Sequence, residues 1–214
     1  MANTQNEEKE VHGLSIELPK VVGDAVLPQP ENLNFYRLYE KRSIYVTGDI
    51  DMWILEVSRM IHIFNIEDAG KPVEERMPIK IFIFTNGGDL MSTWNFIDVV
   101  NISKTPVYTI NYGMCMSAGL LMLAAGHKRF ALPHSVGLYH SGSAEFEGTR
   151  EQIDSLQKWY ESNGKILEKW FLSKCDVDIK MFNRKKKTDW YLTAEELLEY
   201  KIIDRIIENI DEVI

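Results

Sequence analysis

The sequence predicts one α/β domain, built from repeated strand–turn–helix units around a parallel sheet. Short apolar runs alternate along the chain with longer segments whose apolar residues recur at helical spacing. Parallel strands need crossover helices of this kind to connect them. With 214 residues, of which 45% are hydrophobic, the chain is long enough to bury one large core.

The core elements are expected in a regular order. Four short apolar runs predict buried strands: residues 43–48, 79–84, 107–110 and 136–139. Three segments with apolar residues at helical spacing predict helices: residues 52–64, 94–100 and 120–125. A turn of small residues, Gly113–Gly119, is expected between the third strand and the third helix.

A long amphipathic helix is expected from about Thr149 to Ser173. Its apolar face is rich in aromatic side chains: Ile153, Leu156, Trp159, Tyr160, Leu167, Trp170 and Phe171. Such a face is unusual on the surface of a solvated monomer, so we expect it to take part in association. We expect a short strand at 144–148, and we expect the basic run at 184–187 to be a solvated loop.

Residues 1–34 are predicted to form an N-terminal arm. The segment is polar and acidic, and it is interrupted by three prolines: Pro19, Pro28 and Pro30. Only residues 14–18 alternate as a short strand does. We therefore expect a flexible arm or a loosely held hairpin, followed by a folded domain at 35–214 that includes the long helix at about 149–173.

The composition excludes several classes of protein. A net charge of -8 argues against nucleic acid as a partner. No apolar run approaches the roughly 20 residues that cross a bilayer, and the N-terminus lacks the regions of a secretory signal. Cys115 and Cys175 provide neither a disulfide framework nor a metal site. We expect a cytoplasmic protein with no metal or other cofactor and no membrane partner.

Three polar features follow predicted strands, where functional groups gather in α/β proteins. Ser117 lies where a strand gives way to a helix, and free N–H groups at a helix N-terminus favour negative charge. Gly87-Gly88 follows an earlier strand, and glycines let backbone amides approach a ligand closely. His140 ends the last strand beside small residues. A serine, an imidazole and free amides suit acyl transfer.

Four segments in this order resemble the Clp protease proteolytic subunit. They are Asn86-Gly87-Gly88, the serine turn, Leu132-Pro133-His134-Ser135 with His140, and the segment from Asp189 to Glu196. The likeness extends from about residue 34 to 207, most of the chain. It implies the fold that these peptidases share with crotonases: repeated strand–turn–helix units with a protruding long helix.

The resemblance also implies a role for each site residue. Ser117 is expected to be the nucleophile, His140 its general base, and Asp189 the carboxylate that orients the imidazole. The amides of Gly87 and Ala118 are expected to stabilise the oxyanion. Each oxyanion donor contributes on the order of 3 kcal/mol to transition-state binding in other hydrolases.

The resemblance further implies a serine endopeptidase that cuts polypeptides inside a chamber of stacked, seven-membered rings. A ring-shaped unfoldase of the AAA+ class would supply folded substrates. The chain has no glycine-rich phosphate loop with Lys-Ser/Thr, so ATP would be used by that partner. The N-terminal arm stands where the family has its pore-lining loop.

The chain departs from the family pattern at several positions. Asn86 replaces a usual proline, Ser141-Gly142 replaces a Gln-Pro pair, and Thr188 replaces an arginine before the catalytic aspartate. These departures leave a second hypothesis open, an inactive ring-forming scaffold subunit. A third is an acyl-CoA enzyme of the crotonase type. Taken alone, Ser117 could also be a packing or N-cap residue, and Cys115 is an alternative nucleophile.

Overall fold

The computed structural model describes residues 21–22, 25–26 and 30–213. The chain divides into two units at Arg37/Leu38. In the first unit, β1 (Val21–Val22) pairs antiparallel with β2 (Ala25–Val26). The strand expected at 14–18 and most of the expected arm lie outside the described residues, so the arm stays a prediction.

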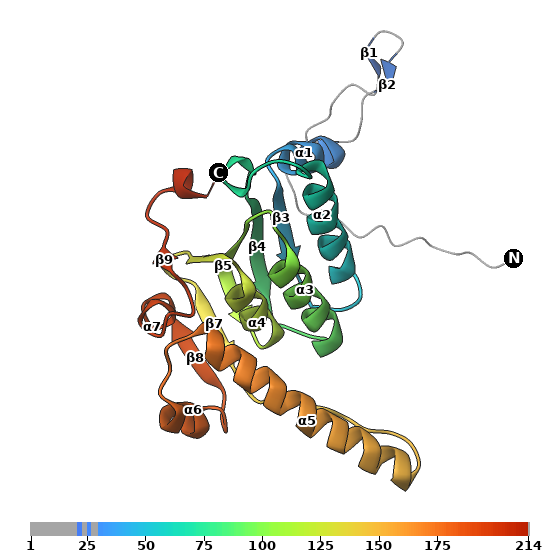
Figure 1. Ribbon diagram of the computed structural model, residues 1–214, viewed down its shortest axis with the longest axis vertical. Coiled ribbons are helices and arrows are strands. Elements are labelled where there is room, and N and C mark those ends of the chain that lie inside the picture. The colour runs from blue at the N-terminus through green and yellow to red at the C-terminus, as the bar shows by residue number, and fades with distance from the viewer. Residues whose placement is uncertain (1–20, 23–24, 27–29, 214) are drawn as a thin grey trace, which may run out of the picture. The chain divides into compact units, whose positions relative to one another are not determined.

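One sheet organises the second unit. In the described part of this unit it has seven strands. Five run parallel in the order β3 (Ser43–Thr47), β4 (Ile79–Thr85), β5 (Val107–Met116), β6 (Lys128–Ala131) and β9 (Arg205–Ile206) (Figure 1). The predicted α/β class with a mostly parallel sheet is thereby confirmed.

The sheet divides along β5. Residues 108–111 of β5 pair with β6, whereas residues 114–116 pair with β7 (Val136–Tyr139). Gly113 lies between the two stretches with φ 143, a conformation that glycine adopts without strain. The small residues expected to form a turn therefore continue the strand as far as Met116. The reason is that β7 supplies the second half of β5 with a hydrogen-bonding partner.

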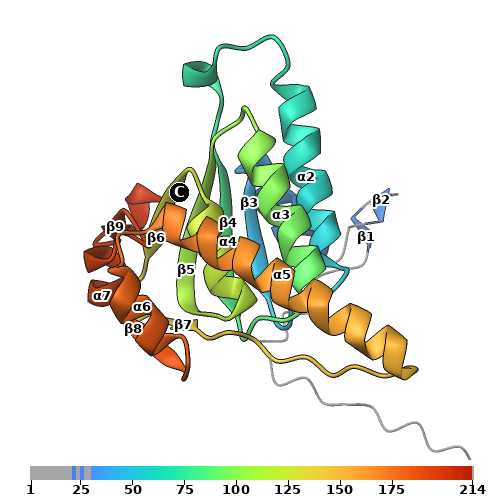
Figure 2. The same cartoon turned by 60° about the horizontal axis from the view of Figure 1, so that its bottom comes forward.

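Helices cover one face of the sheet. Figure 2 shows α2 (Ile54–Glu67), α3 (Leu90–Ile102) and α4 (Ala118–Ala125) side by side on that face. All eight residues of α4 are buried, because the helix lies between the sheet and its neighbours. The helix α1 (Pro30–Glu40) precedes β3 in the chain.

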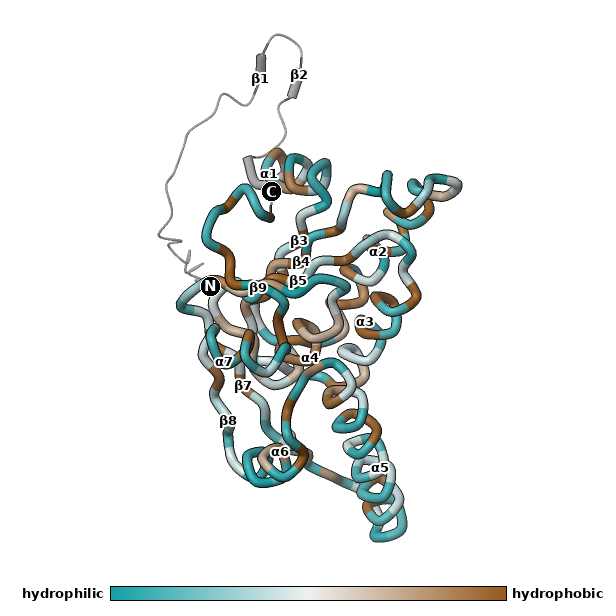
Figure 3. Tube along the Cα trace, turned by 60° about the vertical axis from the view of Figure 1, so that its left-hand side comes forward, coloured by the Kyte–Doolittle hydropathy of each residue, from teal (hydrophilic) through white to brown (hydrophobic). Residues whose placement is uncertain are grey.

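The long helix is confirmed as α5 (Arg150–Lys174). A capping box starts it: the Thr149 hydroxyl accepts from Gln152 N–H, and the Gln152 side chain accepts from Thr149 N–H. Its N-terminal half extends past the edge of the sheet (Figure 1). Apolar residues recur along the helix (Figure 3). Phe171 is fully buried, whereas Trp159 is 48% exposed. The strand expected at 144–148 is absent from the described chain, since no neighbouring strand pairs with this segment.

The chain after α5 holds elements that the sequence pattern did not predict. They are α6 (Ile179–Lys185) and β8 (Trp190–Thr193), whereas α7 (Ala194–Glu199) begins at a capping box of Thr193 and Glu196 that the sequence pattern does show. Each is too short to show a clear period. The basic run expected to be a solvated loop instead ends α6, and Lys186 within it is partly buried.

A buried ion pair joins the start of β3 to the end of α2. The Asp68 side chain is completely buried and receives two hydrogen bonds from Arg42, at 2.5 and 3.0 Å. Lys71 and Thr105 also donate to this carboxylate. The Arg42 hydrogen bonds, helped by those of Lys71 and Thr105, hold the pKa of Asp68 well below its ordinary 3.8.

We predict that Asp68→Asn lowers the free energy of unfolding by about 3 kcal/mol at pH 7. The substitution removes the buried carboxylate and leaves the Arg42 guanidinium only the longer, 3.5 Å pair with the partly exposed Glu67. Urea unfolding at a fixed protein concentration measures this. Because the pKa of Asp68 is depressed, its stabilising contribution is complete above 3.8 and is lost as the pH falls further.

The control is Asp176→Asn, which breaks an exposed pair with Lys201 and should change stability little. Equal effects of the two substitutions would contradict the assignment of Asp68 as a stabilising centre.

Candidate active site

Ser117 stands at the junction of β5 and α4 in a strained conformation. Its φ of 53 and ψ of -120 place it among the few described residues other than glycine with positive φ. Such a conformation costs about 1–3 kcal/mol and persists where surrounding bonds enforce it. Here Ser117 N–H donates to Leu138 O at 2.9 Å, which continues the pairing of β5 with β7. The hydroxyl is thereby fixed beside the end of β7.

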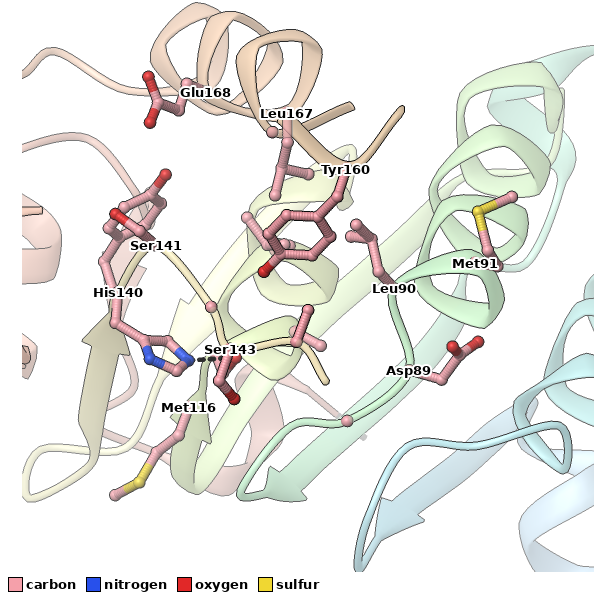
Figure 4. Close-up of a pocket in the computed structure, with 18 of the residues that line it drawn as sticks. Asp89, Leu90, Met91, Met116, His140, Ser141, Ser143, Tyr160, Leu167 and Glu168 are labelled. Carbon is pink, nitrogen blue, oxygen red and sulfur yellow. Dashed lines mark hydrogen bonds between the residues drawn. The ribbon is translucent and has the colours of Figure 1, made fainter. Parts of the chain in front are cut away.

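His140 follows β7 directly and contacts the serine. Its Nε2 lies 2.7 Å from Ser117 Oγ, a contact that the dashed line from the His140 ring marks in Figure 4. Nε2 accepts the hydroxyl proton when Nδ1 carries the ring hydrogen. The two residues expected to form a nucleophile–base pair are therefore brought together, from positions 23 residues apart in the chain.

Asp189 approaches the other side of the imidazole. Strand β8 runs antiparallel to β7 with Tyr139 opposite Trp190, so His140 and Asp189 are the next pair along the two strands. The distance from Asp189 Oδ1 to His140 Nδ1 is 3.9 Å, and the carboxylate is 60% exposed. This distance is too long for a hydrogen bond. The expected third residue is thus near the imidazole without being bonded to it.

The amide groups expected at the oxyanion site differ from one another. Ala118 is the first residue of α4, where a helix leaves its N–H groups without an internal acceptor. Gly87 N–H, however, donates to Thr85 Oγ1 at 3.0 Å, and that hydroxyl donates to Gly48 O. The N–H of Gly87 is therefore already hydrogen-bonded, so the expectation that it stabilises the oxyanion needs correction.

The neighbouring Gly88 is better placed to act as a donor. It lines the cavity beside Ser117. Among the described residues, no acceptor is recorded for its N–H. The sequence pattern could not choose between the two glycines, because the choice depends on the side chain of Thr85. A hydroxyl two residues before a glycine was the available signal.

A cavity of about 620 Å³ opens in front of the serine. Figure 4 shows Tyr160 and Leu167 reaching into it from α5 and Leu90 lying on its opposite side. The remaining lining is largely apolar, with Met91, Met116, Leu121, Leu138 and Phe146. A cleft of this size and character suits an extended chain with apolar side chains.

Cys115 is unsuited to be the nucleophile. Its side chain is completely buried, and its thiol contacts Ile83 O. Burial raises the pKa of Cys115 well above the ordinary range, which disfavours the reactive thiolate. In the described part of the chain, no group of three or more His, Cys, Asp or Glu residues could hold a metal ion. The described helices also include none long and apolar enough to span a bilayer.

Comparison with protein families matches residues 30–210 to the model named Clp protease. The match covers most of the chain. The chain belongs to the Clp protease family.

Curated relatives support the same family across nearly the whole length. The ATP-dependent Clp protease proteolytic subunit 2 of Treponema pallidum is 29% identical over 182 residues, which is 84% of this chain and 88% of the relative. The ATP-dependent Clp protease proteolytic subunit of Deinococcus radiodurans is 28% identical over 180 residues, covering 83% and 86%. The resemblance inferred from four short motifs is thereby confirmed.

We predict that Gly87→Ala in this Clp protease family member slows the reaction of Ser117 with a fluorophosphonate by about 100-fold. The added Cβ would lie 2.7 Å from Met116 O and from Ser117 Cβ, so the serine backbone must shift. Labelling kinetics measure this.

Gly70→Ala is the matched control. Gly70 also has positive φ, at 86, but an added Cβ meets no atom within 4 Å. Its labelling rate should stay within about twofold of the wild type, since only backbone strain is introduced. Equal labelling of the two variants would show that close packing at Gly87 does not hold the serine in place.

Proposed function

We propose that this chain is a serine endopeptidase of the Clp protease type. The observation that carries the proposal is the 2.7 Å contact between Ser117 Oγ and His140 Nε2 beside a large apolar cavity. Ser117 attacks the substrate carbonyl while His140 takes the hydroxyl proton, and His140 then protonates the leaving amine. Water then cleaves the acyl ester on Ser117, with His140 taking a proton from the water and returning it to the serine oxygen. The amides of Ala118 and Gly88 stabilise the oxyanion in this scheme, with Gly88 replacing Gly87.

Asp189 is the third member of the catalytic triad in this proposal. Its carboxylate would hold the imidazole in the tautomer that presents Nε2 to the serine and would stabilise the imidazolium. A shift of about 1 Å would bring the 3.9 Å separation to hydrogen-bonding distance. Catalytic hydrogen bonds are often long before substrate binds, so this separation is compatible with activity.

We further propose that the chain works as stacked seven-membered rings that receive polypeptides from an AAA+ unfoldase in the cytoplasm. Its relatives are named proteolytic subunits of an ATP-dependent protease. Large apolar side chains are exposed on α5, namely Leu156, Trp159 and Ile166. On the sheet face opposite α2 and α3, Tyr45 and Tyr112 pack around Phe82 and are about 40% exposed. Surfaces of this kind favour association.

The scaffold hypothesis remains the second candidate, because Asp189 is exposed and unbonded to His140. A crotonase-type acyl-CoA enzyme is less favoured, since the residues in contact at the start of α4 are a serine and a histidine, whereas such enzymes usually use carboxylates.

We predict that Ser117→Ala lowers hydrolysis of a short fluorogenic peptide by at least about 1,000-fold and abolishes fluorophosphonate labelling. The oligomer should keep its size, because the hydroxyl makes no contact recorded outside the site. Cys115→Ala is the control and should leave turnover nearly unchanged. Unchanged turnover in Ser117→Ala would refute the serine mechanism. An unlabelled wild type would favour the scaffold.

We predict that Ile166→Glu reduces the mass of the assembly measured by light scattering. Ile166 is 57% exposed on α5, and a charge there opposes burial of this face between subunits. Gln157→Glu adds the same charge to a polar, exposed position of the same helix and should leave the mass unchanged. A wild-type mass equal to one chain would contradict ring formation.

A further inference from the structure

An ion pair links α5 to the segment that carries Asp189. Lys186 Nζ donates to both carboxylate oxygens of Glu168, at 2.8 and 2.7 Å. The two side chains are only 23% and 29% exposed, so solvent screens the pair less than a surface pair. Glu168 also lines the active-site cavity, at the α5 side shown in Figure 4.

Lys186 is held by its backbone as well. It caps the C-terminus of α6, where its N–H donates to Phe182 O at 2.9 Å. Its own carbonyl accepts from Ser141 Oγ at 2.8 Å. Ser141 follows His140 directly in the chain. One residue therefore contacts the long helix through its side chain and the histidine segment through its backbone.

Asp189 is the third residue after Lys186, and its neighbours on both sides fix where it lies. On its C-terminal side, Trp190 is buried and pairs with Tyr139. On its N-terminal side, Lys187 and Thr188 are exposed, so Lys186 is the nearest partly buried residue. Thr188 is attached to the end of α6, since its N–H and its hydroxyl donate to Lys185 O at 3.2 and 3.4 Å. The position of the carboxylate is consequently set by Trp190 on one side and by the end of α6, which Lys186 caps, on the other.

We propose that Lys186 is a positioning residue, which Glu168 and Ser141 hold so that the Asp189 carboxylate stays within reach of His140. The inference rests on the proposed peptidase function. A displacement of α5 would move Glu168, Lys186 and Asp189 together. The ion pair between Glu168 and Lys186 therefore couples the long helix to the proposed catalytic residues.

Lys186→Met tests this, because it keeps the aliphatic stem and removes the charge. Peptide hydrolysis by the full-length protein should show kcat lowered about 10- to 100-fold, as expected for a displacement near 1 Å, with KM changed less than about twofold. Lys187→Met is the matched control, since Lys187 is an exposed neighbour in the same basic run. Its kcat should equal that of the wild type.

The exchanged pair Glu168→Lys with Lys186→Glu separates positioning from loss of folding. It should recover a substantial part of the kcat lost in Lys186→Glu alone, because opposite charges again face each other. Equal kcat values in Lys186→Met and Lys187→Met would overturn the inference, and so would an exchanged pair as inactive as the single variant. Wild-type protein without Ser117-dependent turnover would instead refute the proposed function, and the inference with it.

Discussion

The pairing of β5 with β7 is the constraint on which the site depends. The bond from Ser117 N–H to Leu138 O extends this pairing by one residue beyond Met116. It holds the serine in a backbone conformation that the residue would otherwise avoid. Strand β7 also ends at Tyr139, so that His140, the next residue, lies beside the Ser117 hydroxyl. A single strand pair thus positions both Ser117 and His140, the proposed nucleophile and base.

The glycine pair after β4, Gly87-Gly88, packs against the junction of β5 and α4 at Ser117. Gly87 lies so close to Ser117 that a side chain there would overlap Met116 O. Its amide is turned to Thr85, whose hydroxyl also reaches Gly48 O at the end of β3. Three strand ends are thereby connected around the serine. The order of this glycine segment therefore depends on the Thr85 hydroxyl.

The sequence predicted the strong periodic elements well and the site in part. The strands predicted at 43–48, 79–84 and 136–139 and the long helix α5 carry clear apolar patterns, so their positions in the chain followed directly from the sequence. The continuation of β5 past Gly113 did not follow from the sequence, because it depends on pairing with β7, whose residues lie 22 positions further along the chain. The occupied amide of Gly87 depends on a side-chain contact of Thr85. Partners of this kind are set by tertiary structure, which no local spacing records.

His140 and Asp189 are held in place in two different ways, and the distance between them reflects this difference. The serine–histidine contact is built into the sheet, whereas Asp189 follows an exposed connection between α6 and β8. Pairing of Tyr139 with Trp190 brings the Asp189 carboxylate opposite the imidazole, but it does not by itself bring Asp189 Oδ1 within hydrogen-bonding distance of His140 Nδ1. That remaining distance depends on α5, because Glu168 holds the residue that begins the connection. Because α5 exposes apolar residues that favour association, we expect association of subunits and alignment of the Asp189 carboxylate to change together.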